Sequence, residues 1–219
     1  MNGPNRTIKT EIISPTWSAA SSELWRIQNQ RRIHLKNFIV NSRDSSDRKK
    51  IDLSNVVIKP LDPETDRAAF CCGHTKIDNF CKNNAKKQNA SNRVRAYDAC
   101  YEKELIGYYY LVASTHLPEE VSKQANEKFG RVKSAPCVYL GMIGVKENYH
   151  GSGVCRLLML HAMRNTLRVA DIIGLYALTL HADNKDVAER YKGWGFEYFD
   201  EGDLAMYMPI GTIRDALRT

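Results

Sequence analysis

The sequence predicts an α/β domain in which helices cover both faces of a mixed β-sheet, and two patterns carry this prediction. Residues 137–145 form a mostly apolar run of strand length. The stretch that follows repeats its apolar positions every three to four residues from Leu157 to Thr166, as one face of an amphipathic helix does. Strand and helix patterns alternate in this way from residue 55 onward, which is typical of a layered α/β domain.

Each element is predicted from its own periodicity. Alternating or continuous apolar runs indicate strands, a spacing of three to four indicates helices, and Gly, Pro and Asn mark the turns between them. Residues 51–219 then make one domain, long enough to bury a substantial core. In chain order the expected elements are a strand at 55–60, a helix at 75–88, strands at 94–101 and 105–115, a helix at 118–128, a strand at 137–145, a helix at 153–169, a strand at 174–182, a helix at 185–193, and strands at 196–200 and 204–209.

Residues 1–50 form a basic amino-terminal extension. They hold ten Lys/Arg and four Asp/Glu, and therefore +6 of the chain's net charge of +7. Residues 22–40 predict a helix with one apolar face, and residues 41–50 a polar linker. Two interpretations stay open, a helix docked on the domain and a nucleic-acid-binding arm, whereas a membrane-surface helix is disfavoured because Arg31 interrupts the apolar face. That face consists of Leu24, Ile27, Leu35, Phe38 and Ile39.

Composition argues against several classes of protein. The longest apolar runs have strand length and the amino terminus lacks an apolar signal core, so we expect neither a membrane span nor secretion. The six cysteines show no paired zinc spacing and are too sparse for a disulfide scaffold. We therefore expect a cytoplasmic protein with reduced thiols and without a bound metal.

The turn between the strand at 137–145 and the next helix is the strongest functional signal. Gly151 and Gly153 let the backbone approach an anion, and the helix start adds unpaired N–H groups and a partial positive charge, which favours phosphate binding. A dinucleotide fingerprint needs a glycine where Arg156 stands, and a Walker loop needs Gly-Lys-Ser/Thr, which the chain lacks. Taken alone, the turn is also explained as a plain strand-to-helix connection. The candidate phosphate-binding residues are His150, Gly151, Ser152, Gly153, Val154, Cys155 and Arg156.

A second motif follows the strand at 174–182 and runs from Asp183 to Phe196. On its own, it is also explained as a short helix that is capped by Asp183 or Asn184 and ended by Gly195. Its regularly spaced residues are Asn184, Ala188, Tyr191, Gly195 and Phe196.

Together the two motifs resemble the signatures of the GCN5-related N-acetyltransferases (GNAT). In that family a Gln/Arg-x-x-Gly-x-Gly/Ala turn is followed by Asn-x-x-x-Ala-x-x-Phe/Tyr-Tyr-x-x-x-Gly-Phe. The order of the two motifs and their flanking strands agree with the family. The chain departs from the patterns at His150, Cys155 and Arg190.

The resemblance covers residues 55–215 and is closest to the acetyltransferase toxins of bacterial toxin–antitoxin modules. Their opening reads Asp-Arg-x-x-Phe-x-Cys-Gly-x-x-x-Leu-Asp-x-Phe, and residues 66–80 follow this pattern with Ile77 in place of Leu. One strand departs from the family, because the usual Arg-x-Tyr/Val-Val-Ala stands here as Arg95-Ala96-Tyr97-Asp98-Ala99.

The resemblance implies a GNAT fold, in which the mixed sheet is mostly antiparallel and a splayed parallel strand pair holds acetyl-CoA. It implies that the turn binds the pyrophosphate and that the backbone of Ile143, Gly144 and Val145 binds the pantetheine arm. Asn184 then touches the coenzyme, and Tyr191 is the acid that protonates the leaving thiolate, as a phenol with a pKa of about 10 can.

The identity of the acceptor depends on how readily the attacking amine loses its proton. The matched motifs contain no evident carboxylate base, and Glu147 and Glu189 are merely the nearest in sequence. An α-amine with a pKa of about 7.7–8.0 needs less help than a lysine at about 10.4, which favours the substrate that the resemblance implies, aminoacyl-tRNA. An antitoxin protein and a second copy of the chain are further candidate partners. Basic residues that could contact tRNA phosphates are Lys82, Lys86, Lys87, Arg93 and Arg95, with Arg156, Arg164 and Lys192 nearer the coenzyme.

Two other functions stay open from the sequence. One is an acetyltransferase of the same fold that acts on a small-molecule amine or a protein lysine. The other is a non-catalytic module, in which the altered turn (His150, Cys155) binds no acetyl-CoA and the basic extension binds nucleic acid or a protein partner.

Overall fold

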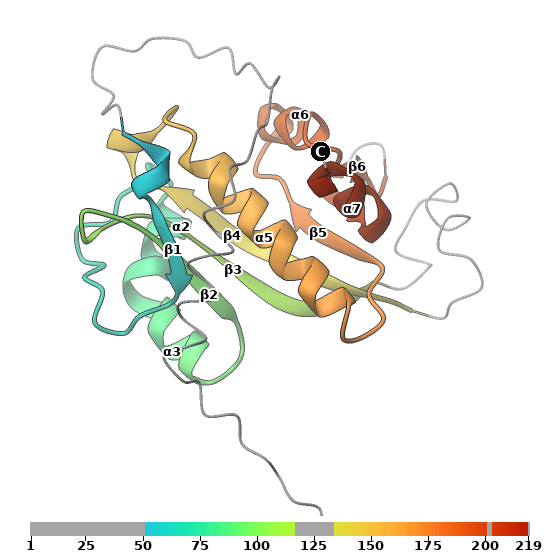
Figure 1. Ribbon diagram of the computed structural model, residues 1–219, viewed down its shortest axis with the longest axis horizontal. Coiled ribbons are helices and arrows are strands. Elements are labelled where there is room, and N and C mark those ends of the chain that lie inside the picture. Colours follow the sequence, from blue (N-terminus) through green and yellow to red (C-terminus); the bar gives the residue numbers. More distant parts are fainter. Residues whose placement is uncertain (1–50, 117–133, 201–202, 219) are drawn as a thin grey trace, which may run out of the picture. The chain divides into compact units, whose positions relative to one another are not determined.

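The computed structural model describes residues 51–116, 134–200 and 203–218. The expected helices at 22–40 and 118–128, the linker and the proposed boundary at residue 50 lie outside these ranges. Within them the chain forms an α/β layered domain around one seven-stranded sheet, as predicted (Figure 1).

The sheet has the order β1-β2-β3-β4-β5-β7-β6. Every neighbouring pair is antiparallel except β4 and β5, which run parallel, so the expected mixed and mostly antiparallel sheet is confirmed. The strands are β1 (Val57–Pro60), β2 (Arg95–Tyr101), β3 (Glu104–His116), β4 (Ala135–Val145), β5 (Ala177–His181), β6 (Glu197–Tyr198) and β7 (Ala205–Pro209).

Helices lie on both faces of this sheet (Figure 1). One continuous helical segment consists of α2 (Thr75–Asn79), a π-helical turn η2 (Phe80–Asn84) and α3 (Ala85–Ala90), where a single helix was expected at 75–88. The other face carries α5 (Val154–Ala170) and α7 (Ile210–Arg218). The remaining helical elements are α6 (Lys185–Lys192) and two short 3-10 turns, η1 (Leu53–Asn55) and η4 (Glu147–Tyr149).

Helix α7 was not predicted. It begins directly after the Pro209 end of β7, and Gly211 in its first turn argues against a helix by propensity. Packing overrides that preference, because Ile213 is fully buried in the main core while Ile210 and Leu217 pack against the same core.

The main core lies between the sheet and α5. Buried α5 residues such as Leu158, Met159 and Ala162 pack on sheet residues that include Ile106 and Leu140. Each of the larger side chains in this core, such as Leu158 or Ile106, contributes about 1.5–3 kcal/mol by leaving water. A second cluster, around Phe70, Cys81 and Tyr108, packs the α2–α3 segment against the opposite face.

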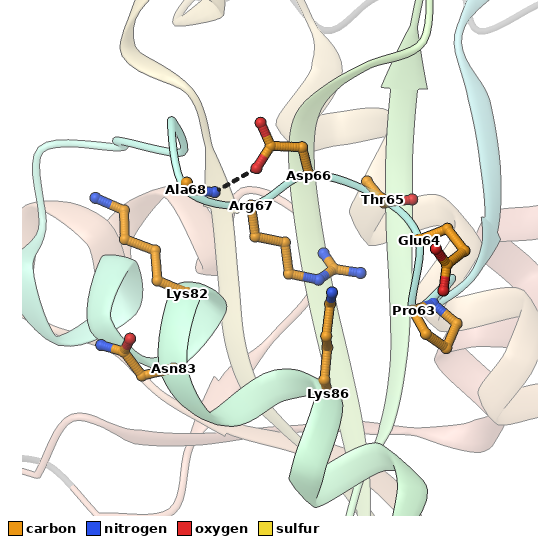
Figure 2. Close-up of a pocket in the computed structure, with 9 residues that line it drawn as sticks. All are labelled: Pro63, Glu64, Thr65, Asp66, Arg67, Ala68, Lys82, Asn83 and Lys86. Atoms are coloured by element: carbon orange, nitrogen blue, oxygen red, sulfur yellow. Dashed lines mark hydrogen bonds between the residues drawn. The ribbon is translucent and has the colours of Figure 1, made fainter.

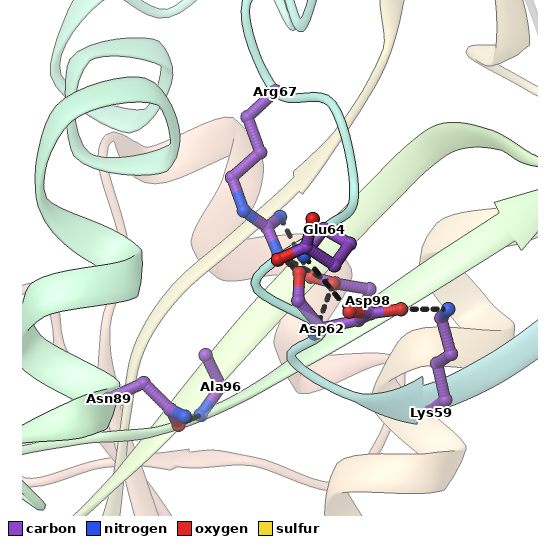
Figure 3. Close-up of polar contacts among 7 residues, drawn as sticks. All are labelled: Lys59, Asp62, Glu64, Arg67, Asn89, Ala96 and Asp98. Carbon is purple, nitrogen blue, oxygen red and sulfur yellow. Dashed lines mark hydrogen bonds and ion pairs between the residues drawn. The ribbon is translucent and has the colours of Figure 1, made fainter.

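The strand that departs from the family pattern owes its unusual residue to a buried ion pair (Figure 3). The guanidinium of Arg67 donates to both carboxylate oxygens of Asp98, at 2.9 and 2.6 Å, and both side chains are almost fully buried. The backbone N–H of Asp62 donates to the same carboxylate at 3.2 Å. Asp98 therefore neutralises a buried charge and fixes the loop after β1 to β2.

We expect Asp98→Asn to lower the free energy of unfolding by about 3–5 kcal/mol, because it leaves the buried Arg67 charge unpaired. The double variant Arg67→Met/Asp98→Val removes both charges and should recover most of that loss. Urea unfolding of the three proteins measures both effects. A single variant within about 1 kcal/mol of wild type would show that the pair is not stabilising in this way.

A second buried polar group lies between α5 and β3. The Tyr109 hydroxyl and His161 Nδ1 are 2.7 Å apart, and Asn165 Nδ2 donates to the Tyr109 oxygen at 2.9 Å. Burial, with smaller contributions from Arg168 and Arg164, lowers the pKa of His161 to about 4. The imidazole is therefore neutral in the folded protein at neutral pH.

This shift predicts a pH dependence of stability. His161 gains a proton at its ordinary pKa of about 6.5 when unfolded but only near pH 4 when folded, so falling pH favours the unfolded state between these values. We expect the free energy of unfolding to lose roughly 3 kcal/mol from this group across that window. Denaturant unfolding of wild type and His161→Gln as a function of pH isolates the effect. The difference in free energy of unfolding between the two proteins should be constant above about pH 7.5 and should fall by roughly 3 kcal/mol as the pH drops from about 6.5 to about 4. A difference that does not depend on pH would contradict the assignment.

Candidate active site

The site is built around the place where β4 leaves β5. The two strands pair over only three positions, Cys137↔Ala177, Val138↔Leu178 and Tyr139↔Thr179, although β4 continues to Val145. The register of β4 against β3 shifts at Gly141, which makes a β-bulge. A Cβ on Gly141 would lie 2.0 Å from the Tyr110 ring, so a side chain at the bulge would require that ring to move. From the bulge onward, β4 pairs with β3 alone among the described strands.

Alternation along β4 decides which backbone groups face this gap. The N–H of Lys146 donates to Ile106 of β3 at 2.8 Å, so Gly144, two residues earlier, also directs its backbone polar groups to β3. The backbone groups of Ile143 and Val145 point the other way, into the space that β5 has left. Gly144 has a packing role, because a Cβ there would lie 2.8 Å from Ile77 of α2.

The glycine turn follows directly and is held to the end of β4. His150 Nε2 lies 2.7 Å from the carbonyl oxygen of Val145, and the Ser152 hydroxyl donates to the Tyr149 carbonyl at 2.6 Å. Gly151 and Gly153 have φ values of 75° and 95°, which favour glycine. His150 therefore uses its ring to fix the turn, a role that its position in the motif did not reveal.

The turn presents a row of backbone donors at the start of α5. Within the described part of the chain, no acceptor bonds the N–H groups of Gly151, Gly153, Val154 and Cys155. Such a group of amides at a helix start binds anions. These donors belong to the backbone and do not depend on the side chains of His150 and Cys155, where the turn departs from the motif. The geometry of the turn therefore suits a pyrophosphate in spite of these two departures.

The second motif follows β5 and forms α6, as expected. The side-chain oxygen of Asn184 accepts the Val187 N–H at 3.0 Å and so caps α6. Tyr191 is half-buried on α6 against the rings of Trp194 and Phe196, at centroid distances of 5.7 and 5.6 Å.

The electrostatic surroundings of Tyr191 include groups from both motifs. Burial raises the pKa of the Tyr191 phenol, Cys155 and Asp183 raise it further, and Arg190 lowers it. Cys155 belongs to the first turn of α5 and Asp183 follows β5, so groups from both segments act on the phenol. The raised pKa keeps the hydroxyl protonated, as a proton donor requires.

The carboxylates considered from the sequence have other contacts. Glu189 accepts from Lys192 at 3.1 Å and from the Tyr198 hydroxyl at 3.3 Å. Glu147 Oε2 lies 3.6 Å from the Cys71 thiol. Sequence reasoning missed His74, whose Nε2 lies 3.2 Å from Asp183 Oδ1; its only signal is its place directly after the Cys-Gly of the opening motif.

The five basic residues proposed for tRNA are exposed and follow one another along η2, α3 and the start of β2. Lys82 and Lys86 line an open cavity of about 580 Å³ beside Arg67 (Figure 2). This cavity contains no residue of the glycine turn or of α6, so it is separate from the coenzyme site. Arg95 donates to Asn92 at 3.1 Å, and Lys192 pairs with Glu189, which leaves Lys192 less available to a phosphate.

Three further observations bear on the expected class of protein. No helix in the described ranges is long and apolar enough to cross a membrane. The described residues also contain no cluster of three or more His, Cys, Asp or Glu side chains suited to a metal ion. All six cysteines are free thiols.

Comparison with known proteins identifies the family. The model of the acetyltransferase (GNAT) family matches residues 65–196, which contain the glycine turn and α6. The chain belongs to the GNAT acetyltransferase family. It is therefore an acetyltransferase, as expected from the two motifs.

Relatives within the family include proteins named as toxins. The chain is 31% identical over 175 residues to the probable toxin TacT of Sinorhizobium fredii (strain NBRC 101917 / NGR234), covering 74% of this chain and 94% of TacT. The structure is similar to that of AtaT complexed with acetyl-methionyl-tRNAfMet, at 26% identity and a TM-score of 0.68 over 75% of this chain and 99% of AtaT.

Two other structures of the same system match comparably. AtaTR bound with acetyl-CoA matches at 25% identity and a TM-score of 0.66, over 76% of this chain and all of that one. A Tyr-to-Phe variant of AtaT bound to the C-terminus of the antitoxin AtaR matches at 26% identity and a TM-score of 0.63, over 75% of this chain and 97% of that one.

The turn geometry predicts that Gly153→Glu abolishes acetyl-CoA binding. The substitution strains a backbone at φ 95° and places a carboxylate where the pyrophosphate must approach. Gly174→Glu is the matched control, because a Cβ at Gly174 meets no atom within 4 Å. Calorimetric titration with acetyl-CoA, alongside circular dichroism to check the fold, measures the effect. Equal affinity in the two variants would contradict the assignment of the turn.

Proposed function

We propose that the chain is an acetyl-CoA-dependent N-acetyltransferase that acetylates the α-amine of aminoacyl-tRNA and so acts as a toxin that stops translation. One observation carries the proposal. The gap between β4 and β5, the free amides of the turn and the phenol of Tyr191 converge on one place, and the relatives that share this fold are toxins.

The coenzyme fits the donors that the chain presents. We assign the pyrophosphate to the amides of Gly151, Gly153, Val154 and Cys155. The pantetheine amides would pair with the backbone of Ile143 and the N–H of Val145, since the Val145 carbonyl already accepts from His150. Asn184 would contribute only its amide nitrogen, since its oxygen caps α6.

The chemistry then assigns one role to Tyr191. Acetyl-CoA supplies the acetyl group as a thioester, and transfer to an amine releases a thiolate. Tyr191 lies near the first turn of α5, where the coenzyme would enter, and its raised pKa keeps a proton available for that sulfur. The Tyr-to-Phe variant used in the AtaT structure is consistent with a functional tyrosine in that toxin.

Three observations support aminoacyl-tRNA as the acceptor. AtaT was solved with acetyl-methionyl-tRNA, the acetylated form of such an acceptor. An α-amine has a pKa of about 7.7–8.0 and is substantially neutral at physiological pH. The exposed basic residues at 82–95 offer contacts for the tRNA phosphates, with Lys82, Lys86, Lys87, Arg93 and Arg95 the candidates.

Location and partners follow from the substrate. Acetyl-CoA and aminoacyl-tRNA are found in the cytoplasm, so we place the protein there. We infer an antitoxin partner because AtaT was solved with the C-terminus of AtaR. A homodimer stays a prediction, as does a nucleic-acid or docking role for residues 1–50.

The direct test of this function is mass spectrometry of aminoacyl-tRNA. Total charged tRNA is incubated with the full chain and acetyl-CoA, digested to aminoacyl-adenosine and analysed for N-acetylated products. We expect acetylation of one or a few aminoacyl species. Activity confined to polyamines or peptides would replace this proposal with the small-molecule or lysine alternative.

Tyr191→Phe tests the acid. The variant loses only a hydroxyl, and we expect turnover to fall by about 100- to 10,000-fold with acetyl-CoA affinity nearly unchanged. Tyr198→Phe, which removes another hydroxyl of the same region that bonds to Glu189, is the control and should stay near wild type. If Tyr191→Phe keeps more than half the wild-type rate, another group or water protonates the thiolate.

A further inference from the structure

One contact in the site has no role in the chemistry described so far. His74 Nε2 lies 3.2 Å from Asp183 Oδ1, across 109 residues of sequence. His74 is the N-cap residue of α2, and Asp183 directly precedes Asn184, the N-cap of α6. The contact thus joins the α2 side of the domain to the helix that carries Tyr191. Neither residue stands at a position that the two family motifs specify.

The geometry of this pair fixes the direction of the hydrogen bond. His74 Nδ1 is buried and has no hydrogen-bond partner among the described residues. A proton on Nδ1 would be a buried, unsatisfied donor, so the proton belongs on Nε2, which points to the carboxylate. His74 therefore donates to Asp183 and is not arranged to accept a proton from a substrate.

One carboxylate oxygen of Asp183 is available to a ligand. Its side chain is 62% exposed, and in the described part of the chain only Oδ1 has a partner. Asp183 stands between the end of β5 and the N-cap of α6, the helix that carries Tyr191, and its carboxylate contributes to the raised pKa of that phenol. Oδ2 can therefore accept a hydrogen bond from a group that approaches this end of α6.

We propose that Asp183 binds the amino nitrogen of the acceptor and stabilises the positive charge that develops on it, while His74 positions the Asp183 carboxylate. The inference rests on the proposed function, since it assigns a site for the amine of that reaction. It also explains how a chain without an evident base handles the amine.

The step balances without a further reactant. The lone pair of the neutral amine forms the N–C bond, and the nitrogen becomes positive beside Asp183. The C–S bond then breaks, its electron pair stays on sulfur, and Tyr191 gives that sulfur a proton. The nitrogen beside the exposed Asp183 carboxylate then releases its extra proton to solvent, and the Tyr191 phenolate takes up a proton from solvent. A carboxylate placed where charge develops lowers the barrier more than it aids binding.

The test compares Asp183→Asn with Asp186→Asn, an exposed acid in the first turn of α6 that serves as a charge control. With acetyl-CoA saturating, we expect Asp183→Asn to lower kcat/KM for aminoacyl-tRNA by about 10- to 100-fold, mainly through kcat. Acetyl-CoA affinity and the melting temperature should stay at wild-type values. Asp186→Asn should remain within about two-fold of wild type in kcat/KM.

The role of His74 has its own controls. His74→Ala should reproduce part of the loss, and His74→Gln, whose amide can still donate, should recover much of it. His181→Gln is the matched control, because His181 Nε2 makes a similar exposed contact of 3.5 Å with Asp203. His181→Gln should leave kcat/KM unchanged.

Three outcomes would overturn the proposal: equal effects of Asp183→Asn and Asp186→Asn, a parallel loss of acetyl-CoA affinity, or a loss explained by a lower melting temperature. Failure of the proposed function is distinguishable, because it appears in the wild-type chain as no acetylation of aminoacyl-tRNA. In that case the same variants are compared on whichever amine the wild type acetylates. A kcat/KM for Asp183→Asn well below that for Asp186→Asn would still support the role of Asp183, and equal values would overturn it. A wild-type chain that acetylates no amine overturns both.

Discussion

The early separation of β4 from β5 is the constraint on which the site depends. Backbone N–H and C=O groups inside a sheet must find partners, and beyond Tyr139 those on the open side of β4 are not paired by another described strand. The bulge at Gly141 selects which residues face the gap, because it changes the alternation so that Ile143 and Val145 point into it. A ligand with its own amides can satisfy these groups, which is why an edge opened inside a sheet becomes a binding site.

The neighbouring elements are arranged around that gap. His150 holds the glycine turn to Val145, so the anion-binding amides follow directly on the open strand. Helix α6 brings Tyr191 to the start of α5. On the opposite face, Gly144 lets Ile77 of α2 pack closely against β4, and His74 is the N-cap residue of α2. The residues that we propose for the coenzyme, the acid and the acceptor thus come from three separate segments around the end of β4.

Much of this could be predicted from sequence because it is local. The glycine turn, the strand before it and the helix after it are encoded within about twenty residues, and periodicity located them. What could not be predicted depends on distant contacts. Asp98 looked like a departure from the family, and only tertiary structure shows that it pairs with Arg67. Asn184 could be read as a cap or a coenzyme ligand, and the bond to Val187 shows that its oxygen caps α6, which leaves only its amide nitrogen for the coenzyme. His74 and Asp183 are 109 residues apart, so no spacing connects them.

We propose that the open backbone of β4 and the turn amides hold acetyl-CoA, and residue-resolved amide hydrogen exchange, measured by NMR with and without acetyl-CoA, is the decisive experiment. The amides of Ile143, Val145, Gly153 and Val154 should exchange at least about ten-fold more slowly in the complex, whereas the amide of Gly174 should not change. Protection confined to residues 63–68 and 82–86, around the separate cavity, would show that acetyl-CoA binds elsewhere.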